Sequence, residues 1–300
     1  NMSHKNKQPH RSTRSISSPN GRYELTVGID QAGAVWYELH DGEAVVVAPS
    51  TLSLVDTMER DWLHVPDDTV HDYVESTFDE TWEQPWGEQR YVRNHYNELA
   101  LTTDVVTVRF RLFDEGLGFR YELAGEGDIT ILRESTEFNI GREAHAWWIP
   151  ALGQNHYEHL YKRSVIPEID TAHTPLTIEL PSGKYMAIHE AALYDYGAMN
   201  LVPSEQGLRS TITPLSSGGV AHISLPFTVP WRTMILADSA VGLMTPRIML
   251  NLNEPSKIED TSWIKPTKFM GIWWAMFIGY YTWSSGEKHG ATTANAMRYI

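Results

Sequence analysis

Polar and apolar side chains alternate through most of the chain up to residue 255, and this pattern predicts β-strands. Residues 22–29 and 105–113 alternate with a period of two, which is typical of a strand with one buried face. Turn residues separate such segments, as in Asp41-Gly42 and in the acidic, glycine-containing stretch 114–118. Many short strands divided by Gly, Pro and Asp predict a sandwich of antiparallel sheets.

The pattern changes after residue 255. Residues 256–268 are polar and are interpreted as a linker. Residues 269–277 are apolar throughout, as expected of a strand that is buried on both faces. Thr292-Thr293 can cap a helix over residues 294–300. One strand and one helix cannot bury themselves, so we interpret residues 269–300 as the first βα unit of a truncated α/β domain.

Composition narrows the classes of function. A net charge of -14 argues against a nucleic-acid partner, because a polyanion would be repelled. The chain has no Cys, which excludes disulfides and thiol catalysis and leaves the compartment open. The nearly uncharged run 269–283 is too short for a membrane helix, so no membrane span is expected. Residues 1–18 are polar and basic without Asp or Glu, and are predicted to be a disordered lead-in to a β domain over 19–255.

Glu190 is the first candidate site residue. It lies in the apolar, strand-like segment 185–193, where a charge is costly unless a metal ion, an Arg or a set of sugar hydroxyls compensates it. Residue type alone favours a glutamate at a strand end that points to solvent. The adjacent His189 faces the opposite way and is interpreted as structural.

Aromatic side chains provide the other candidates. Trp82 and Trp86 lie near amide and carboxylate groups that suit sugar recognition, although a loop folding over the sandwich explains them as well. Trp147 and Trp148 are adjacent on a strand, so at most one of them can line a pocket.

In the second domain, Trp274 and Trp283 lie near the carboxyl end of the predicted strand, where α/β barrels bind their ligands. Packing in a barrel core would explain both residues equally well. Phosphate-binding loops, His-Glu-x-x-His, Gly-x-Ser-x-Gly and nicotinamide fingerprints are missing from the sequence.

Several short motifs occur in an order and spacing that make chance agreement improbable. They are Asn94–Leu99, Asp114–Tyr121, Ala146–Pro150, Ile188–Leu193, Pro230–Thr233, Leu250–Ile258, Asp260–Pro266, Gly271–Trp274 and Lys288–Thr293. With these motifs the sequence resembles glycoside hydrolase family 97, which contains α-glucosidases and α-galactosidases.

The resemblance implies a mainly β fold: an N-terminal antiparallel β-supersandwich followed by the start of a catalytic (β/α)8 barrel. It implies an exo-acting hydrolase of terminal α-linked glucose or galactose, outside the cytoplasm, in the periplasm or secreted. The catalytic acid and its base or nucleophile would come from later barrel strands, so no catalytic residue is assigned here and the 300 residues alone are expected to be inactive.

One site residue follows from the resemblance. The glutamate of the family's His-Glu-Ala-Ala-Leu segment, which is Glu190 here, binds a calcium ion (Ca2+) together with carboxylates of the barrel. Trp274 and Trp283 are the candidate contacts to an oligosaccharide or α-glycoside substrate. The alternatives are a non-catalytic carbohydrate-binding or scaffolding module, and an enzyme whose barrel has lost its acids.

Overall fold

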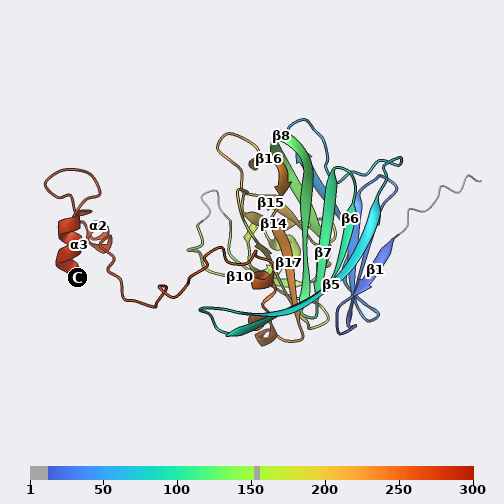
Figure 1. Cartoon of the computed structure of the whole chain (residues 1–300), viewed down its shortest axis with the longest axis horizontal. Coiled ribbons are helices and arrows are strands. Elements are labelled where there is room, and N and C mark those ends of the chain that lie inside the picture. The colour runs from blue at the N-terminus through green and yellow to red at the C-terminus, as the bar shows by residue number, and fades with distance from the viewer. Residues whose placement is uncertain (1–12, 152–155) are drawn as a thin grey trace, which may run out of the picture. The chain divides into compact units, whose positions relative to one another are not determined.

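The structure is a computed structural model that describes residues 13–151 and 156–300 (Figure 1). The chain divides into a larger unit that ends at Pro255 and a smaller unit, Ser256–Ile300. The larger unit is mainly β and antiparallel, with few helices, as the alternating pattern predicted. No helix among the described residues combines the length and apolar character that a membrane span requires.

The larger unit contains seventeen strands among its described residues. They are β1 Arg14–Ser17, β2 Tyr23–Ile29, β3 Val35–Asp41, β4 Ala44–Asp56, β5 Asp72–Glu83, β6 Tyr91–Thr102, β7 Val106–Phe113, β8 Gly116–Phe138, β9 His145–Trp148, β10 Lys162–Val165, β11 Ala172–His173, β12 Leu176–Glu179, β13 Tyr185–Ala191, β14 Met199–Pro203, β15 Leu208–Ile212, β16 Ala221–Thr228 and β17 Trp231–Ala237. The helices of its described residues are the 3-10 turns η1 Ile166–Glu168 and η2 Val241–Met244 and the α-helix α1 Ile248–Asn251, whereas α2 Trp274–Phe277 and α3 Thr293–Tyr299 belong to the smaller unit.

The long strand β8 connects the sheets. Its first part pairs with β7 and β17, and later parts pair with β16, β4 and β15, all antiparallel. On the other side of β17 lies β13, which continues through β12 and β9 to β10. Strands that are far apart in the sequence therefore become neighbours around β8 and β17.

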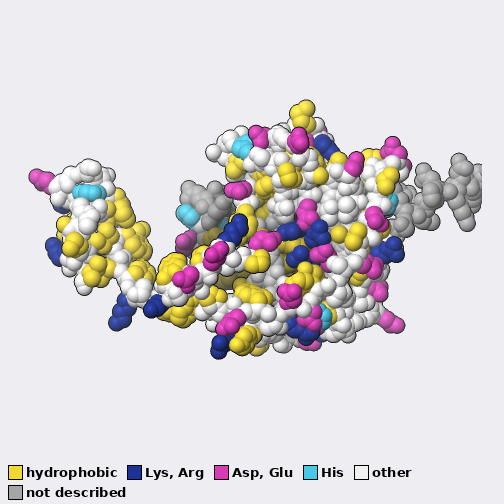
Figure 2. Space-filling model, in the orientation of Figure 1, with side chains coloured by type: hydrophobic (Ala, Val, Ile, Leu, Met, Phe, Trp, Pro, Cys, Tyr) yellow, Lys and Arg dark blue, Asp and Glu magenta, His cyan; other side chains and the backbone are white. Residues whose placement is uncertain are grey.

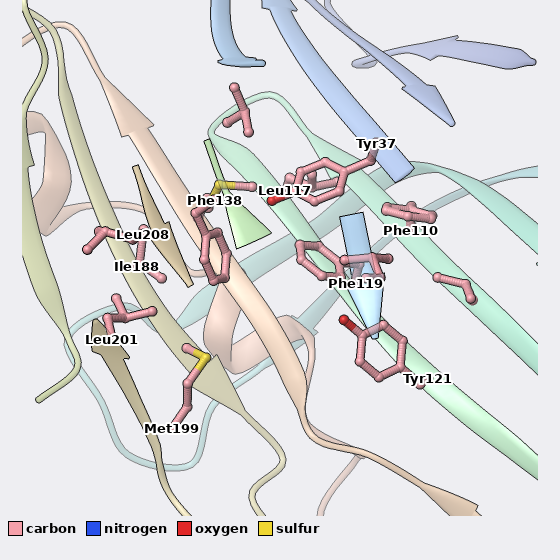
Figure 3. Close-up of a cluster of buried hydrophobic side chains, with 14 of the residues drawn as sticks. Tyr37, Phe110, Leu117, Phe119, Tyr121, Phe138, Ile188, Met199, Leu201 and Leu208 are labelled. Carbon is pink, nitrogen blue, oxygen red and sulfur yellow. The ribbon is translucent and has the colours of Figure 1, made fainter. Parts of the chain in front are cut away.

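The main core lies between the facing sheets. Figure 3 shows the rings of Tyr37, Phe110 and Phe119 on one side and aliphatic side chains such as Leu201 on the other, with Phe138 between the two groups. All of these side chains are buried. Burying such a continuous apolar set is the dominant favourable term in folding.

A second, smaller core covers the opposite face of β8 and β17. Trp231 and Ile235 of β17 pack there with Leu252, directly after α1. Gly118 permits this contact, because a Cβ atom at that position would lie 2.4 Å from Leu252 Cδ1. The segment that ends the larger unit is thus packed against the sheet.

The first predicted boundary differs from the structure. Residues 1–12 lie outside the described residues, but Arg14–Ser17 form β1, which pairs with β2 in antiparallel register. The prediction of a disordered lead-in is therefore wrong for this part. Ile16 packs against the main core, so a mostly polar segment gains both backbone pairing and one apolar contact.

The predicted buried strand over residues 269–277 is wrong. The structure has the short helix α2 at Trp274–Phe277, and side chains such as Phe269 are exposed. A parallel strand needs hydrogen-bonding neighbours, whereas a helical turn satisfies part of its backbone internally. The predicted helix is confirmed: α3 begins after Thr292, whose side chain accepts a hydrogen bond from the Asn295 backbone N–H.

Candidate functional site

Glu190 lies on the core-facing side of β13. It shares this side with Met186 and Ile188, which belong to the main core, and the residue is only 8% exposed. The alternation along the strand therefore carries a carboxylate inward rather than to solvent. The reading of Glu190 as a solvent-facing strand end does not hold.

Arg232 compensates the buried charge of Glu190. The two residues are direct cross-strand partners in the β13–β17 register, and Arg232 Nη1 donates to Glu190 Oε1 at 2.7 Å. The Met199 backbone N–H donates to the other oxygen, Oε2, at 3.0 Å. Of the three forms of compensation that the sequence allowed, the side chains of this structure supply the arginine.

A second buried glutamate shares Arg232. Glu134 of β8 accepts from Arg232 Nε at 3.0 Å and from Nη2 at 2.7 Å, which is a bidentate pair. The side chains of Glu134 and Arg232 are 0% exposed and that of Glu190 is 6% exposed. We call Glu134, Arg232 and Glu190 the buried triad. Because one arginine lies between two glutamates, the formal charge of the triad is −1.

Burial and pairing act on the pKa values of the triad in opposite directions. Burial raises the pKa of Glu190 above its ordinary value, while Arg232 and the Met199 N–H lower it. Burial alone would lower the pKa of Arg232, but Glu134 and then Glu190 raise it above its usual range. Arg232 therefore stays charged, and its charge is what holds the two carboxylates in the core.

The donor chemistry of Glu190 fits a calcium ligand in part. A carboxylate has about four lone-pair sites, and each Glu190 oxygen accepts one hydrogen bond from the donors described above. Ca²⁺ requires six to eight oxygen ligands. Among the described residues, no three His, Cys, Asp or Glu side chains are grouped so that they could hold a metal ion. Glu190 can thus supply one ligand, and the remaining ligands would have to come from elsewhere.

His189 occupies the opposite side of β13, as predicted. Its ring Nδ1 lies 2.9 Å from Thr174 Oγ1, and burial lowers its pKa. A neutral imidazole that is bonded to a hydroxyl group is in keeping with the structural role inferred for it.

Trp274 and Trp283 belong to the smaller unit and are exposed. Trp274 lies in α2, and its ring stacks on that of Trp273 with centroids 4.7 Å apart. The side chains of Trp274 and Trp283 are 63% and 59% exposed, so neither is part of a packed core. Glu190, in contrast to these two tryptophans, belongs to the larger unit.

Trp82 lies on a strand rather than in a loop. β5 and β6 form a long, curved hairpin (Figure 1). Trp82 Nε1 donates to Asn251 Oδ1 at 2.8 Å, which ties the hairpin to α1. A hollow of about 320 Å³ next to this contact is lined by polar groups, including Arg93, His95 and Asp114. The bond explains Trp82 as a structural residue.

The adjacent tryptophans of β9 point to opposite faces, as predicted. Trp148 is 4% exposed and donates from Nε1 to Ser164 Oγ at 3.0 Å. Trp147 lies on the other face, beneath the Arg163 guanidinium. Both side chains are accounted for by packing and by these local contacts.

Sequence reasoning missed Arg232 and Glu134. A signal for Arg232 was present, because it is the one basic residue in the segment Trp231–Ala237, which is otherwise free of charge. An arginine in a buried strand requires an anion just as a glutamate requires a cation. Glu134 has no comparable signal, because it lies among charged and polar neighbours in β8.

The chain is similar to the same protein family in its sequence and in its structure. Residues 16–255 match the family model described as Glycosyl-hydrolase 97 N-terminal. A Glycoside Hydrolase Family 97 enzyme from Pseudoalteromonas sp. strain K8, solved in complex with acarbose, is 36% identical with a TM-score of 0.83. That match covers 95% of this chain and 45% of the other, and a variant of the same enzyme was solved in complex with panose.

Two relatives are named for activity on galactosides. A retaining alpha-galactosidase of Bacteroides thetaiotaomicron is 22% identical over 294 residues, which cover 86% of this chain and 44% of the relative. A probable retaining alpha-galactosidase of Streptomyces bingchenggensis is 28% identical over 168 residues, which cover 55% of this chain and 25% of the relative. The chain thus spans less than half the length of these proteins.

Proposed function

Because this chain belongs to glycoside hydrolase family 97, we propose that it is the N-terminal portion of an exo-acting α-glycosidase that releases terminal α-linked glucose or galactose. One observation carries the proposal: 95% of the chain matches, at 36% identity, a family enzyme solved in complex with acarbose. In this proposal the β domain of residues 19–255 supports a (β/α)8 barrel that begins within residues 269–300.

The catalytic carboxylates would lie outside these residues. Glycoside hydrolysis needs two carboxyl groups on either side of the scissile bond, one acting as an acid and the other as a base or nucleophile. Buried glutamates of the β domain are instead paired with arginines: Glu134 and Glu190 with Arg232, and Glu98 with Arg109. A carboxylate whose oxygens are held by an arginine inside the β domain is not positioned beside a scissile glycosidic bond, so none of these glutamates is assigned as the acid or the base.

We propose that Glu190 supplies one ligand to a calcium ion of the intact enzyme. Support comes from the unused acceptor capacity of its carboxylate and from the net negative charge of the buried triad. When bound, calcium would place positive charge next to the reacting groups. Replacing Glu190 by Gln should weaken calcium binding, as measured by titration of the metal-free enzyme.

The exposed rings of Trp274 and Trp283 would contact the sugar, because the CH faces of a pyranose pack on aromatic rings. Replacing either ring by Ala should then raise KM for the glycoside. The extracytoplasmic location implied by the family also remains a proposal, which cell fractionation tests.

The decisive experiment compares the intact enzyme with residues 1–300 alone. The intact enzyme should hydrolyse an aryl α-glucoside or an aryl α-galactoside, and the 300 residues, shown to be folded by circular dichroism, should hydrolyse neither. Turnover by the pure fragment would overturn the assignment of catalysis to later residues. An intact protein that binds oligosaccharide without turnover would instead be a carbohydrate-binding module.

A further inference from the structure

Arg232 is shared unequally between the two glutamates of the buried triad. Glu134 receives two of its N–H groups as a bidentate pair, at 3.0 and 2.7 Å, whereas Glu190 receives one, at 2.7 Å. Bidentate geometry makes the first pair the stronger of the two. Most of the compensation that Arg232 offers is therefore directed to Glu134.

Other donors complete the shell of Glu134. The Tyr196 hydroxyl donates to Oε1 at 3.0 Å, and the Thr136 and Ser210 hydroxyls donate to Oε2 at 2.8 and 3.3 Å. With the two bonds from Arg232, five donors surround one carboxylate, which saturates its lone pairs. Glu190 has two donors, so free acceptor capacity in the triad is concentrated on Glu190.

We propose that Glu134 and Arg232 are positioning residues that keep Glu190 available to a divalent oxygen-seeking cation; this rests on the calcium role proposed above. Arg232 and the Met199 N–H fix the orientation of the Glu190 carboxylate. Glu134 takes up most of the charge of Arg232, so the three groups together keep a net negative charge that attracts the cation to Glu190. Hydrogen-bonding partners behind a ligand commonly set its affinity in this way.

A purely architectural triad would behave differently. Loss of Glu134 would then lower the stability of the fold but leave the calcium affinity of the folded enzyme unchanged. Under the proposal, loss of Glu134 lowers that affinity because the Arg232 charge is redirected to Glu190. Removing the arginine charge as well should then restore part of the affinity, which no architectural role predicts.

The experiment measures calcium affinity of the intact enzyme by isothermal titration calorimetry after removal of metal, with melting curves as a check of folding. Glu134→Gln should weaken affinity about 10-fold or more. The double variant Glu134→Gln with Arg232→Gln should recover much of that loss. Thr136→Val is the matched control, because it removes one hydrogen bond to Glu134 and no charge.

The outcomes separate this inference from the calcium proposal. Unchanged affinity in Glu190→Gln would refute the calcium role itself. Weakened affinity in Glu190→Gln together with unchanged affinity in Glu134→Gln would overturn the positioning role. If Glu134→Gln does not fold, Arg232→Lys replaces it, since lysine keeps the charge but cannot hold both carboxylates. In that variant, affinity should again fall about 10-fold, and unchanged affinity would overturn the inference.

Discussion

Two ionic clusters lie on opposite faces of β8 and β17. The buried triad faces the main core. The other, which we call the outer cluster, consists of Glu98, Arg109, Arg111, Arg120 and Glu122. Figure 2 shows acidic and basic side chains next to one another over these strands. The triad has an excess of negative charge, whereas three arginines face two glutamates in the outer cluster.

Solvent access is the main difference between them. The side chains of the outer cluster are 10–26% exposed, against 0–6% in the triad. The guanidinium groups of Arg111 and Arg120 also lie over the ring of Trp231, 4.8 and 4.4 Å from its centroid. Arg232 of the triad also lies over a ring, that of Tyr196, at 5.7 Å, so water is what can compensate a lost partner in the outer cluster but not in the triad.

The largest expected effect comes from removing the shared cation of the triad. Arg232→Met leaves two buried carboxylates without their counter-ion and should destabilise the fold by about 3–5 kcal/mol. Urea denaturation of the 300-residue chain measures the change. The matched control is Arg133→Met on β8, whose side chain is 54% exposed and which should cost less than about 1 kcal/mol. Equal costs would show that burial does not decide how much the loss of an arginine destabilises the fold.

The next effect is non-additivity within the triad. Glu134→Met leaves two Arg232 N–H groups without their acceptor, and Arg232→Met leaves two carboxylates without their counter-ion, whereas the double variant leaves only Glu190 unpaired. The cost of the double variant should therefore fall below the sum of the single costs by about 1–3 kcal/mol. A double-mutant cycle by urea denaturation tests this, and simple additivity would contradict the strong coupling inferred from the two hydrogen bonds.

The smallest effect concerns pH dependence in the outer cluster. Burial alone would raise the pKa of Glu122, but Arg109 and Arg120 lower it below its ordinary value. A carboxylate with a lowered pKa stabilises the fold above its unfolded pKa, and this contribution is lost as pH falls through its folded pKa. Glu122→Gln should thus cost about 1 kcal/mol at pH 7.

This cost should shrink as the pH is lowered from about 7 toward 3, where the carboxyl group protonates in both states. The exposed Glu126 of the same strand provides the control, and Glu126→Gln should have little effect at either pH. A cost in Glu122→Gln that stays constant with pH would show that its charge is not what stabilises the cluster.

Strand content was predictable because it depends on local alternation. The segments expected at 22–29 and 105–113 are β2 and β7. The secondary structure of the apolar run 269–277 was not predictable from its pattern. The same pattern suits a buried strand or an exposed turn of helix, and only the presence of a neighbouring strand decides between them. Thr292 was predictable as a cap, since its hydrogen bond is made within one turn.

The partner of Glu190 could not be predicted from the neighbouring residues in the sequence. From the sequence alone, a carboxylate in an apolar strand had to be compensated, and an arginine was one of the candidates. The identity of the partner depends on the register of β13 against β17, which places Arg232 opposite Glu190, 42 residues away in the chain. The second glutamate, 98 residues before Arg232, depends on how β8 crosses between the sheets.

The sequence by itself determined that the chain builds antiparallel sheets and that Glu190 is a costly charge, because both follow from the order of neighbouring side chains. Tertiary structure alone decided that Arg232 lies between two glutamates and that one of them keeps free acceptor sites. Long-range strand pairing creates that arrangement, and its energy comes from desolvated charges that approach one another only in the folded state.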